Sequence, residues 1–188
     1  MDIKHKWNGK YSNKLRQNEY MNPPEPNERL RQIAENLKGE TAIDIACGLG
    51  GNSIFLAGMG FEVTAVDISE VAVKYISEQV DRFALKVSAL VADMSVTGGI
   101  VFEGKYDLAV ITYYLDRNIF PKVKEIVKDQ GFFFMETFYK VDTETVNQTI
   151  SDKYKLESNE LLKEFSDWKI LFFEESEQDG RQTILCQK

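Results

Sequence analysis

A glycine-rich loop directly after a short apolar run is the feature that most constrains this chain. The run covers Thr41–Ala46, and the loop continues as Cys47-Gly-Leu-Gly-Gly51. Glycine has no Cβ, so the backbone can turn tightly at such positions and approach a ligand closely. The apolar run predicts a buried strand, and the apolar residues after the loop predict a helix whose free N–H groups favour an anion or carboxylate. Strand, loop and helix in this order predict a ligand site.

Strand patterns and helix patterns alternate along most of the remaining chain. Asn27 and Ser69 are expected to cap the helices that follow them. Including the first run, strands are expected at 41–46, 61–66, 87–92, 108–112, 132–135, 168–175 and 182–187, the last two joined as a hairpin across Asp179-Gly180. We therefore expect an α/β fold, a Rossmann-like, seven-stranded, mostly parallel sheet with helices on both faces and a C-terminal antiparallel hairpin strand.

The length of 188 residues suffices for one well-filled core and is too short for two full domains with a linker. Residues 27–188 are therefore expected to form a single domain. Residues 1–26 are polar and end in a proline-rich stretch. They are expected to be either a frayed leader or a lid over the ligand site, because Trp7, Tyr11 and Tyr20 are costly to leave in water.

Composition narrows the expected partners and location. The net charge of −7 and the lack of a dense Lys/Arg cluster disfavour nucleic acid as a partner. No apolar run approaches the roughly 20 residues that cross a bilayer, and the N-terminus lacks the apolar core of a signal peptide, so a cytoplasmic location without a membrane partner is expected. With two cysteines and one histidine, neither a disulfide framework nor a metal site is expected. The expected assembly is a monomer or a homodimer.

Ligands of doubly wound sheets bind beyond the carboxyl ends of the strands, so residues just after the strands are candidates for cofactor binding. Asp67 lies 19 residues beyond Gly48, where a carboxylate can accept hydrogen bonds from two ribose hydroxyls. Asp93 ends the third strand and is placed to face an adenine amino group. The candidate cofactor-binding residues are Asp44, Ala46, Cys47, Gly48, Asn52, Asp67, Ile68, Asp93, Met94 and Thr112.

These features fit NAD as well as S-adenosylmethionine (SAM). A dinucleotide fingerprint needs Gly or Ala at the end of G-x-G-x-x-G, where Ser53 stands in this chain. Asp44 before the loop disfavours a pyrophosphate and suits a cationic ligand end, such as the amino group of a methionine moiety. The residues therefore favour SAM, and an NAD oxidoreductase is a more distant alternative.

The segment Asp44-Ile-Ala-Cys-Gly-Leu-Gly-Gly-Asn-Ser53 resembles the first motif of class I SAM-dependent methyltransferases, and Val63-Thr-Ala-Val-Asp67-Ile-Ser resembles the second. Tyr106–Arg117 and the later 160–171 stretch are similar to the tellurite-resistance-type branch of small enzymes. The resemblance implies that Asp44 supports the methionine end, Gly48 lies under SAM, Asp67 holds the ribose and Asp93-Met94 flank adenine. S-adenosylhomocysteine would be the product. Ala46 departs from the family pattern, because many relatives have glycine there.

The acceptor side is expected after the fourth strand and at the N-terminal segment, with Tyr11, Tyr113, Asp116 and Arg117 as candidate substrate residues. For Asp116 and Arg117 the alternative is a helix cap and an ion pair. Enzymes that methylate the amino groups of adenine or glutamine carry an Asn/Asp-Pro-Pro-Tyr-type tetrad at this place. Thr112-Tyr-Tyr-Leu115 lacks both prolines, which disfavours that class of enzyme.

The methyl group of SAM is already activated, so positioning supplies much of the rate, and no catalytic residue is identified. The predicted function is methyl transfer from SAM to a small-molecule acceptor, with a thiol or a chalcogen oxyanion as candidates. The alternative is a catalytically silent SAM-binding sensor or partner subunit.

Overall fold

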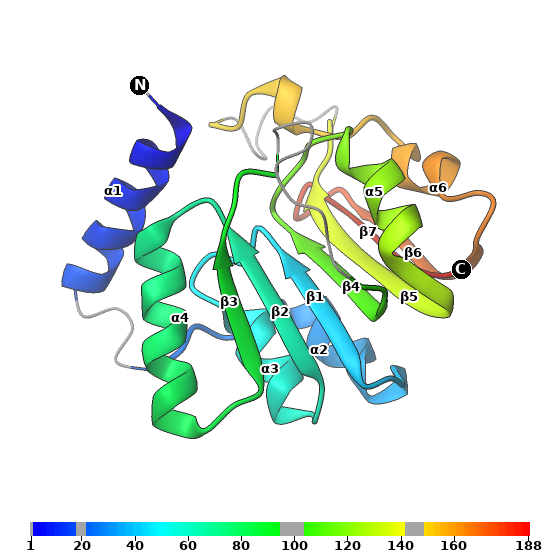
Figure 1. The fold of residues 1–188 in the computed structure, drawn as a ribbon. Helices are drawn as coiled ribbons and strands as arrows, with labels where there is room; N and C mark the ends of the chain where they lie inside the picture. Colours follow the sequence, from blue (N-terminus) through cyan, green and yellow to red (C-terminus); the bar gives the residue numbers. More distant parts are fainter. Residues whose placement is uncertain (1, 18–21, 95–103, 142–148) are drawn as a thin grey trace. The chain divides into compact units, whose positions relative to one another are not determined.

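The computed structural model describes residues 2–17, 22–94, 104–141 and 149–188 (Figure 1). The chain divides into two compact units, residues 1–103 and residues 104–188, which are described in turn. Tyr20, noted in the sequence, lies outside the described residues.

Three parallel strands form the sheet of the first unit. They are β1 (Thr41–Ile45), β2 (Glu62–Asp67) and β3 (Val87–Val91), in the order β3-β2-β1. β2 pairs in parallel with β1 and with β3, and Asp67 at its end pairs with Val91. The apolar residues of β1 are fully buried, as expected for a strand covered on both faces. The carboxyl ends of all three strands therefore meet at one edge, where the glycine loop begins.

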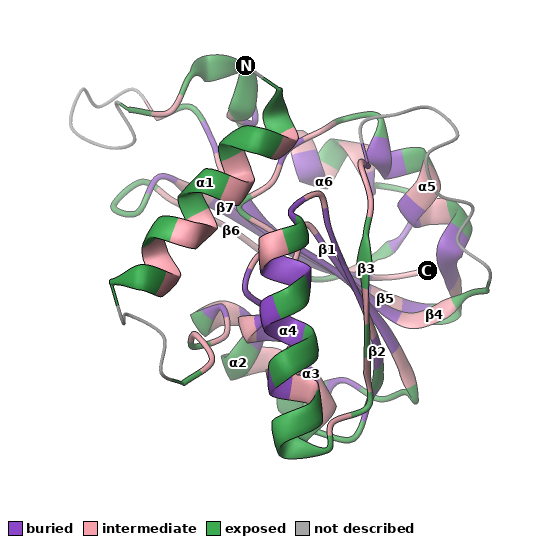
Figure 2. Ribbon diagram, turned by 60° about the vertical axis from the view of Figure 1, so that its left-hand side comes forward, coloured by how far each residue is buried: buried purple, intermediate pink, exposed green. Residues whose placement is uncertain are grey.

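The helices of the first unit are α1 (Ile3–Arg16), α2 (Glu28–Ile33) with a 3₁₀ turn η1 (Ala34–Asn36), α3 (Gly51–Gly58) and α4 (Glu70–Phe83). The two predicted caps are confirmed. The Asn27 side chain accepts a hydrogen bond from the Leu30 N–H at 2.9 Å, and the Ser69 hydroxyl accepts one from the Ala72 N–H at 3.3 Å. α4 is amphipathic, with its apolar stripe buried and its outer face exposed (Figure 2).

The helix α1 was not expected from the sequence, because its residues form no apolar stripe and none of them is buried. Asp2 caps it by accepting a hydrogen bond from the Lys4 N–H. Tyr11 and Leu15, both partly buried, pack against a small cluster formed by Leu49, Ala72 and Tyr75. The segment is therefore ordered by contacts with the glycine loop and α4 rather than by a core of its own.

The second unit contains β4 (Tyr106–Thr112), α5 (Ile119–Ile126), β5 (Val127–Phe138), η2 (Asp152–Tyr154), α6 (Glu160–Glu164), β6 (Lys169–Ser176) and β7 (Arg181–Gln187). β4 and β5 are parallel, whereas β7 is antiparallel to both β5 and β6. The predicted terminal hairpin is thus confirmed. Phe133 and Phe134 are fully buried, and the Phe133 ring packs against Phe165 with centroids 4.7 Å apart.

β5 begins earlier than predicted, at Val127 instead of Phe132. Val127 pairs with Tyr106, and the pairing resumes with Phe132 opposite Leu108, so a bulge separates the two. At Gly131, an added Cβ would lie 2.9 Å from the Lys128 carbonyl oxygen. Gly131 therefore permits a bulge inside β5, and the strand continues through it.

Within the residues described, no helix combines the length and the apolar character that a membrane crossing requires.

Candidate functional site

The glycine loop connects β1 to α3 through three residues with positive φ. Ala46 (φ +56°), Gly48 (φ +58°) and Gly50 (φ +79°) turn the chain within a few residues. The Gly50 N–H donates to the Cys47 carbonyl at 3.0 Å, which closes the turn, and Gly50 then serves as the N-cap of α3. An added Cβ on Gly50 would lie 2.7 Å from Ile76 on α4, so only glycine fits there.

Asp67, at the end of β2, is bonded directly to the loop. Its Oδ2 accepts a hydrogen bond from the Gly48 N–H at 2.8 Å, and its Oδ1 accepts one from the Ser69 N–H at 2.9 Å. The carboxylate is only 5% exposed. Burial raises the pKa of Asp67, while the two backbone donors act against that rise. The loop and Asp67, the residue predicted to bind the ribose, are thus held in one fixed arrangement.

Asp44, on β1 below the loop, is fully buried. Its Oδ2 accepts a hydrogen bond from the Ser53 hydroxyl at 2.6 Å, and its Oδ1 has no hydrogen-bond partner among the described residues. Burial, reinforced by the charge of Asp67, raises the pKa of Asp44 from 3.8 to about 7. An orphaned buried carboxylate oxygen is costly, and it is relieved when a donor or a cation approaches.

The remaining candidate cofactor residues of the first unit follow the same strand ends. Asn52 is buried, and its Oδ1 accepts a hydrogen bond from the Asn27 N–H at 2.8 Å, which ties α3 to the cap of α2. Ile68 follows β2 and is half-buried. Asp93, half-buried, and Met94, buried, follow β3. The structure therefore brings Asp44, Gly48 and Asp67 together, with the others on adjoining segments.

Cys47 lies in the loop as a free cysteine. Burial of its sulfur, together with the charges of Asp44 and Asp67, raises the pKa of the thiol well above its usual value. The thiolate is the reactive form of cysteine, so Cys47 is kept as an unreactive neutral thiol. Among the described residues no group of three or more His, Cys, Asp or Glu side chains is arranged to hold a metal ion.

α1 covers the glycine loop. The Tyr11 hydroxyl lies 2.9 Å from the position that a Cβ on Gly48 would occupy, and the Tyr11 ring stacks on Trp7 with centroids 5.6 Å apart. Burial, followed by the negative charge of Asp67, raises the pKa of Tyr11. Asn8 fixes the helix, because its Oδ1 accepts a hydrogen bond from the Ser69 hydroxyl at 2.7 Å. Lys4 adds an ion pair with Glu70.

In the second unit, Thr112 ends β4 and is half-buried. Tyr113 follows it in the left-handed region (φ +57°), and its N–H donates to the Glu136 carbonyl at 2.8 Å. The Tyr113 side chain is 44% exposed. The left-handed region is unusual for a bulky residue, so this position is strained.

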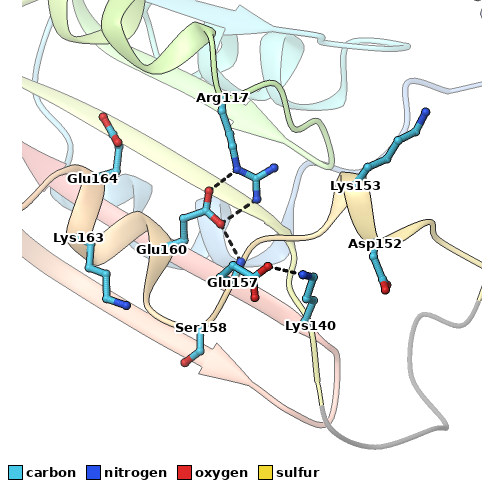
Figure 3. A pocket seen from close by; sticks show the side chains of 9 residues that line it. All are labelled: Arg117, Lys140, Asp152, Lys153, Glu157, Ser158, Glu160, Lys163 and Glu164. Carbon is cyan, nitrogen blue, oxygen red and sulfur yellow. Dashed lines mark hydrogen bonds and ion pairs between the residues drawn. The ribbon is translucent and has the colours of Figure 1, made fainter.

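Asp116 and Arg117 are engaged in local contacts. Asp116 Oδ1 accepts hydrogen bonds from the backbone and side-chain N–H groups of Asn118, both at 3.0 Å. Arg117 forms a two-point ion pair with Glu160, with Nε 2.5 Å from Oε1 and Nη2 2.8 Å from Oε2. A pocket of about 670 Å³ opens beside this pair (Figure 3). Its charged lining comprises Arg117, Lys140, Asp152, Lys153, Glu157, Glu160, Lys163 and Glu164, with Ser158.

One polar cluster of the second unit was missed in the sequence. Glu136 on β5 is 2% exposed and contacts Tyr113, Arg181 and Thr183. The available signal was a single acidic residue inside the apolar run Phe132–Phe138. Its partners are the residue directly after β4 and two residues of β7, so sequence spacing alone gave no reason to group them.

The family model "Tellurite resistance protein TehB" matches residues 17–183, which is most of the chain. The chain belongs to the TehB family. A curated TehB-family relative, the "Probable S-adenosyl-L-methionine-dependent methyltransferase TehB" of Haemophilus influenzae, is 24% identical over 141 residues, covering 71% of this chain and 48% of that protein.

A second curated relative, which does not carry the name TehB, is also a putative methyltransferase. The "Putative methyltransferase YqeM" of Bacillus subtilis is 31% identical over 123 residues, covering 59% of this chain and 48% of that protein. The chain thus spans about half the length of these curated relatives.

Solved structures show the same fold. The crystal structure of TehB from Haemophilus influenzae superposes with a TM-score of 0.73 at 22% identity, covering 87% of this chain and 62% of that one. Geranyl diphosphate C-methyltransferase from Streptomyces coelicolor, solved with S-adenosyl-L-homocysteine, gives a TM-score of 0.66 at 14% identity, covering 85% of this chain and 77% of that one.

These findings confirm the predicted fold class, a seven-stranded, mostly parallel Rossmann-like sheet with C-terminal antiparallel strands. They also confirm the resemblance to the tellurite-resistance-type branch. The TehB relative from Haemophilus influenzae is named as a probable S-adenosyl-L-methionine-dependent methyltransferase, which is the enzyme class and the cofactor predicted from this sequence.

Proposed function

We propose that this TehB-family chain transfers a methyl group from SAM to a small-molecule acceptor, with thiols and chalcogen oxyanions as the candidate classes. The observation that carries the proposal is the buried Asp44 carboxylate, whose Oδ1 has no partner among the described residues and lies below a loop closed by Gly48 and Asp67. An anionic, partly unsatisfied site under a glycine loop suits a ligand with a cationic end.

The residues of the first unit fit such a cofactor. Asp44 supports its amino end, the backbone at Gly48 lies against it, and Asp67 accepts hydrogen bonds from its ribose, while Asp93 and Met94 flank its adenine. Ala46, Cys47, Asn52, Ile68 and, in the second unit, Thr112 complete the proposed set. Bound SAM supplies a methyl group already activated on a sulfonium, so the protein has only to bind, orient and exclude water.

α1 serves as a lid in this proposal. Tyr11 lies against Gly48, and the contacts between the helix and α4 seen in the described residues are polar ones and a small apolar cluster. Such an element can detach at low cost compared with a core helix. The acceptor residues of the proposal are Tyr11 on this helix and Tyr113, Asp116 and Arg117 in the second unit.

Soft acceptors agree with the residues found. Cys47 is kept neutral by burial, and no metal-ligating cluster occurs in the described part of the chain, so the observed side chains provide binding and orientation. A thiolate or a reduced chalcogen oxyanion is already a strong nucleophile and needs no strong base. The name of the matching family, tellurite resistance, supports the chalcogen class for this chain.

The test is calorimetric titration with SAM and S-adenosylhomocysteine, followed by a methyl-transfer screen over thiols, chalcogen oxyanions and small amines. Asp67→Ala should weaken cofactor binding at least about tenfold, because a charge-assisted hydrogen bond contributes about 1.5–3 kcal/mol. Asp67→Asn retains one oxygen that can accept the Gly48 N–H. It therefore separates the loss of the charged cofactor contact from the loss of the contact with the loop. Asp81→Ala, an exposed residue on α4, is the matched control and should bind like the unaltered protein.

Two outcomes would count against the proposal. Failure to bind either cofactor form would eliminate it. Binding without S-adenosylhomocysteine production from any acceptor would favour the alternative, a SAM-binding sensor or partner subunit.

A further inference from the structure

Three polar side chains, one directly after β4 and two on β7, meet around the buried Glu136 carboxylate of β5 in the second unit. Glu136 Oε2 accepts a hydrogen bond from the Thr183 hydroxyl at 2.9 Å, and its Oε1 accepts one from the Tyr113 hydroxyl at 3.1 Å. Arg181 Nη1 lies 3.4 Å from the same Oε1. The strand register explains the meeting, because Glu136 pairs with Thr112 on one side and Thr183 on the other. We call Tyr113, Glu136, Arg181 and Thr183 the Glu136 cluster.

Glu136 holds Tyr113 at two points. Its carbonyl accepts the Tyr113 N–H at 2.8 Å, and its carboxylate accepts the hydroxyl of the same residue. These contacts keep Tyr113 in the left-handed region while its side chain stays 44% exposed. Backbone strain that is retained in this way often marks a functional site. The ring is thus aimed to the surface directly after β4.

Arg181 is not used up by Glu136. The contact of its Nη1 with the carboxylate is long at 3.4 Å, and its buried Nε has no partner among the described residues. Arg117 in the same unit shows the alternative, a two-point pair with Glu160 at 2.5 and 2.8 Å. The Arg181 guanidinium instead lies over the Tyr113 ring, 5.1 Å from its centroid, and its side chain is 39% exposed. It therefore retains N–H donors that face away from Glu136.

We infer that Arg181 and Tyr113 form a recognition site for an acceptor that carries a carboxylate, and that Glu136 is the positioning residue that holds both. A guanidinium presents a planar fork that matches a carboxylate with two parallel hydrogen bonds, and stacking on an aromatic ring fixes its orientation. Thr183, Tyr113 and Arg181 occupy the Glu136 oxygens, so the cluster selects for an anion rather than a cation. This inference rests on the proposed function and narrows its acceptor class.

The test compares two thiols that share a nucleophile and differ in charge, mercaptoacetate and 2-mercaptoethanol. Binding of each to the full chain is measured by calorimetry in the presence of S-adenosylhomocysteine. The unaltered protein should bind mercaptoacetate about tenfold more tightly, the scale of one partly exposed charge-assisted contact. Arg181→Gln should abolish this preference, Arg181→Lys should keep part of it, and Arg82→Gln, which removes an exposed guanidinium on α4, should leave it unchanged.

Variants at Glu136 test the positioning role through the same preference ratio, which a general loss of stability would not alter. Glu136→Gln keeps groups that can bond to Thr183 and Tyr113, so the preference should survive. Glu136→Ala removes every side-chain contact of the cluster, so the preference should disappear in the fraction that circular dichroism shows to be folded. If Glu136→Ala does not fold, Arg181→Gln still decides the question.

Equal binding of the two thiols to the unaltered protein, or an undiminished preference in Arg181→Gln, would overturn the inference. The methyl-transfer assay separates it from the proposed function. Transfer to both thiols with equal KM would leave the proposed function standing without this inference. Selective binding of mercaptoacetate without transfer to any acceptor would leave the recognition site standing without the proposed function. In a transferring enzyme, Arg181→Gln should raise KM for mercaptoacetate, whereas Arg82→Gln should leave this KM unchanged.

Discussion

At the scale of single residues, the end of β1 holds two groups in unfavourable states. Ala46 adopts a left-handed backbone conformation with φ +56°, and Asp44 buries a carboxylate whose Oδ1 has no partner in the described part of the chain. The first is a local steric cost, because a Cβ crowds the following carbonyl oxygen. The second is a cost of desolvation. Each cost can be measured with a single substitution, Ala46→Gly for the first and Asp44→Asn for the second.

Ala46→Gly should stabilise the protein, because glycine adopts φ +56° without the Cβ penalty of about 1–2 kcal/mol. We expect a gain of about 1 kcal/mol in the free energy of unfolding, or about 2–4 °C in Tm for a chain of this size. Ala57→Gly in α3 is the control and should cost about 1 kcal/mol, since glycine is unfavourable inside a helix. Urea denaturation measures both, and a loss of stability in Ala46→Gly would contradict the account of Ala46.

Asp44 should make the stability of the cofactor-free protein depend on pH. Its pKa in the folded protein is about 7, above the usual 3.8, so between these values the folded state binds more protons than the unfolded state. The free energy of unfolding should therefore fall as pH rises from about 4 to 7, by up to about 4 kcal/mol. The fall should be smaller in Asp44→Asn, and denaturation at pH 5 and pH 8 gives the difference. Identical pH dependence in both proteins would contradict this prediction.

The same titration should act on cofactor affinity with the opposite sign. The cationic end of SAM favours the charged carboxylate, so binding should strengthen as Asp44 loses its proton through pH 7. For one group of that pKa we expect about tenfold tighter binding at pH 8 than at pH 6. Calorimetry on the unaltered protein and on Asp44→Asn measures this, and the variant should show a flatter profile.

At the scale of elements, α1 is the helix whose attachment can be altered without disturbing a core. Asn8 accepts hydrogen bonds from the Ser69 hydroxyl at 2.7 Å and the Val71 N–H at 3.5 Å, at the start of α4. Asn8→Ala should loosen α1 by about 1 kcal/mol, speed amide hydrogen exchange in residues 3–16 and weaken S-adenosylhomocysteine binding a few-fold. Asn13→Ala, an exposed residue of the same helix, controls for helix propensity. Faster exchange with unchanged affinity would show that α1 is not a lid.

The elements that the sequence predicted are those whose signals are local. β1, β2 and α4 combine a buried apolar pattern with a cap or a glycine turn. Both strands were placed to within one residue at each end, and Ser69 marked the start of α4. α1 could not be predicted, because its order depends on Tyr11 and Leu15 contacting residues far along the chain. The bulge at Gly131 depends on the register between β4 and β5. The Glu136 cluster likewise joins three strands, so only the folded chain reveals it.

At the scale of the whole molecule, the division into two units gives a prediction about where the cofactor acts. All but one of the proposed cofactor residues lie in residues 1–103. Saturating S-adenosylhomocysteine should therefore slow amide hydrogen exchange mainly in the glycine loop, at the end of β2 and in α1. At a ligand concentration of 100 times Kd, linkage adds about 2.7 kcal/mol to the free energy of unfolding.

Calorimetry and exchange mass spectrometry together check that prediction. The Tm should rise by about 5–10 °C for a chain of this length. At the same ligand concentration, Asp67→Ala should reduce the gain in the free energy of unfolding to about 1.4 kcal/mol or less, because binding that is tenfold weaker leaves the ligand at about 10 times Kd. Protection confined to residues 104–188 would place the cofactor elsewhere.

In the proposed reaction, the position of Asp44 and Asp67 beneath one loop also bears on product release. Methyl transfer turns a sulfonium into a neutral thioether, so the reacted ligand carries one positive charge less than the incoming one. The two carboxylates stay buried at the same positions, where their negative charges are poorly solvated and favour a cationic ligand. The electrostatic attraction between these carboxylates and the ligand therefore weakens once the methyl group has been transferred. A site that prefers its charged ligand in this way is protected from retaining its spent one.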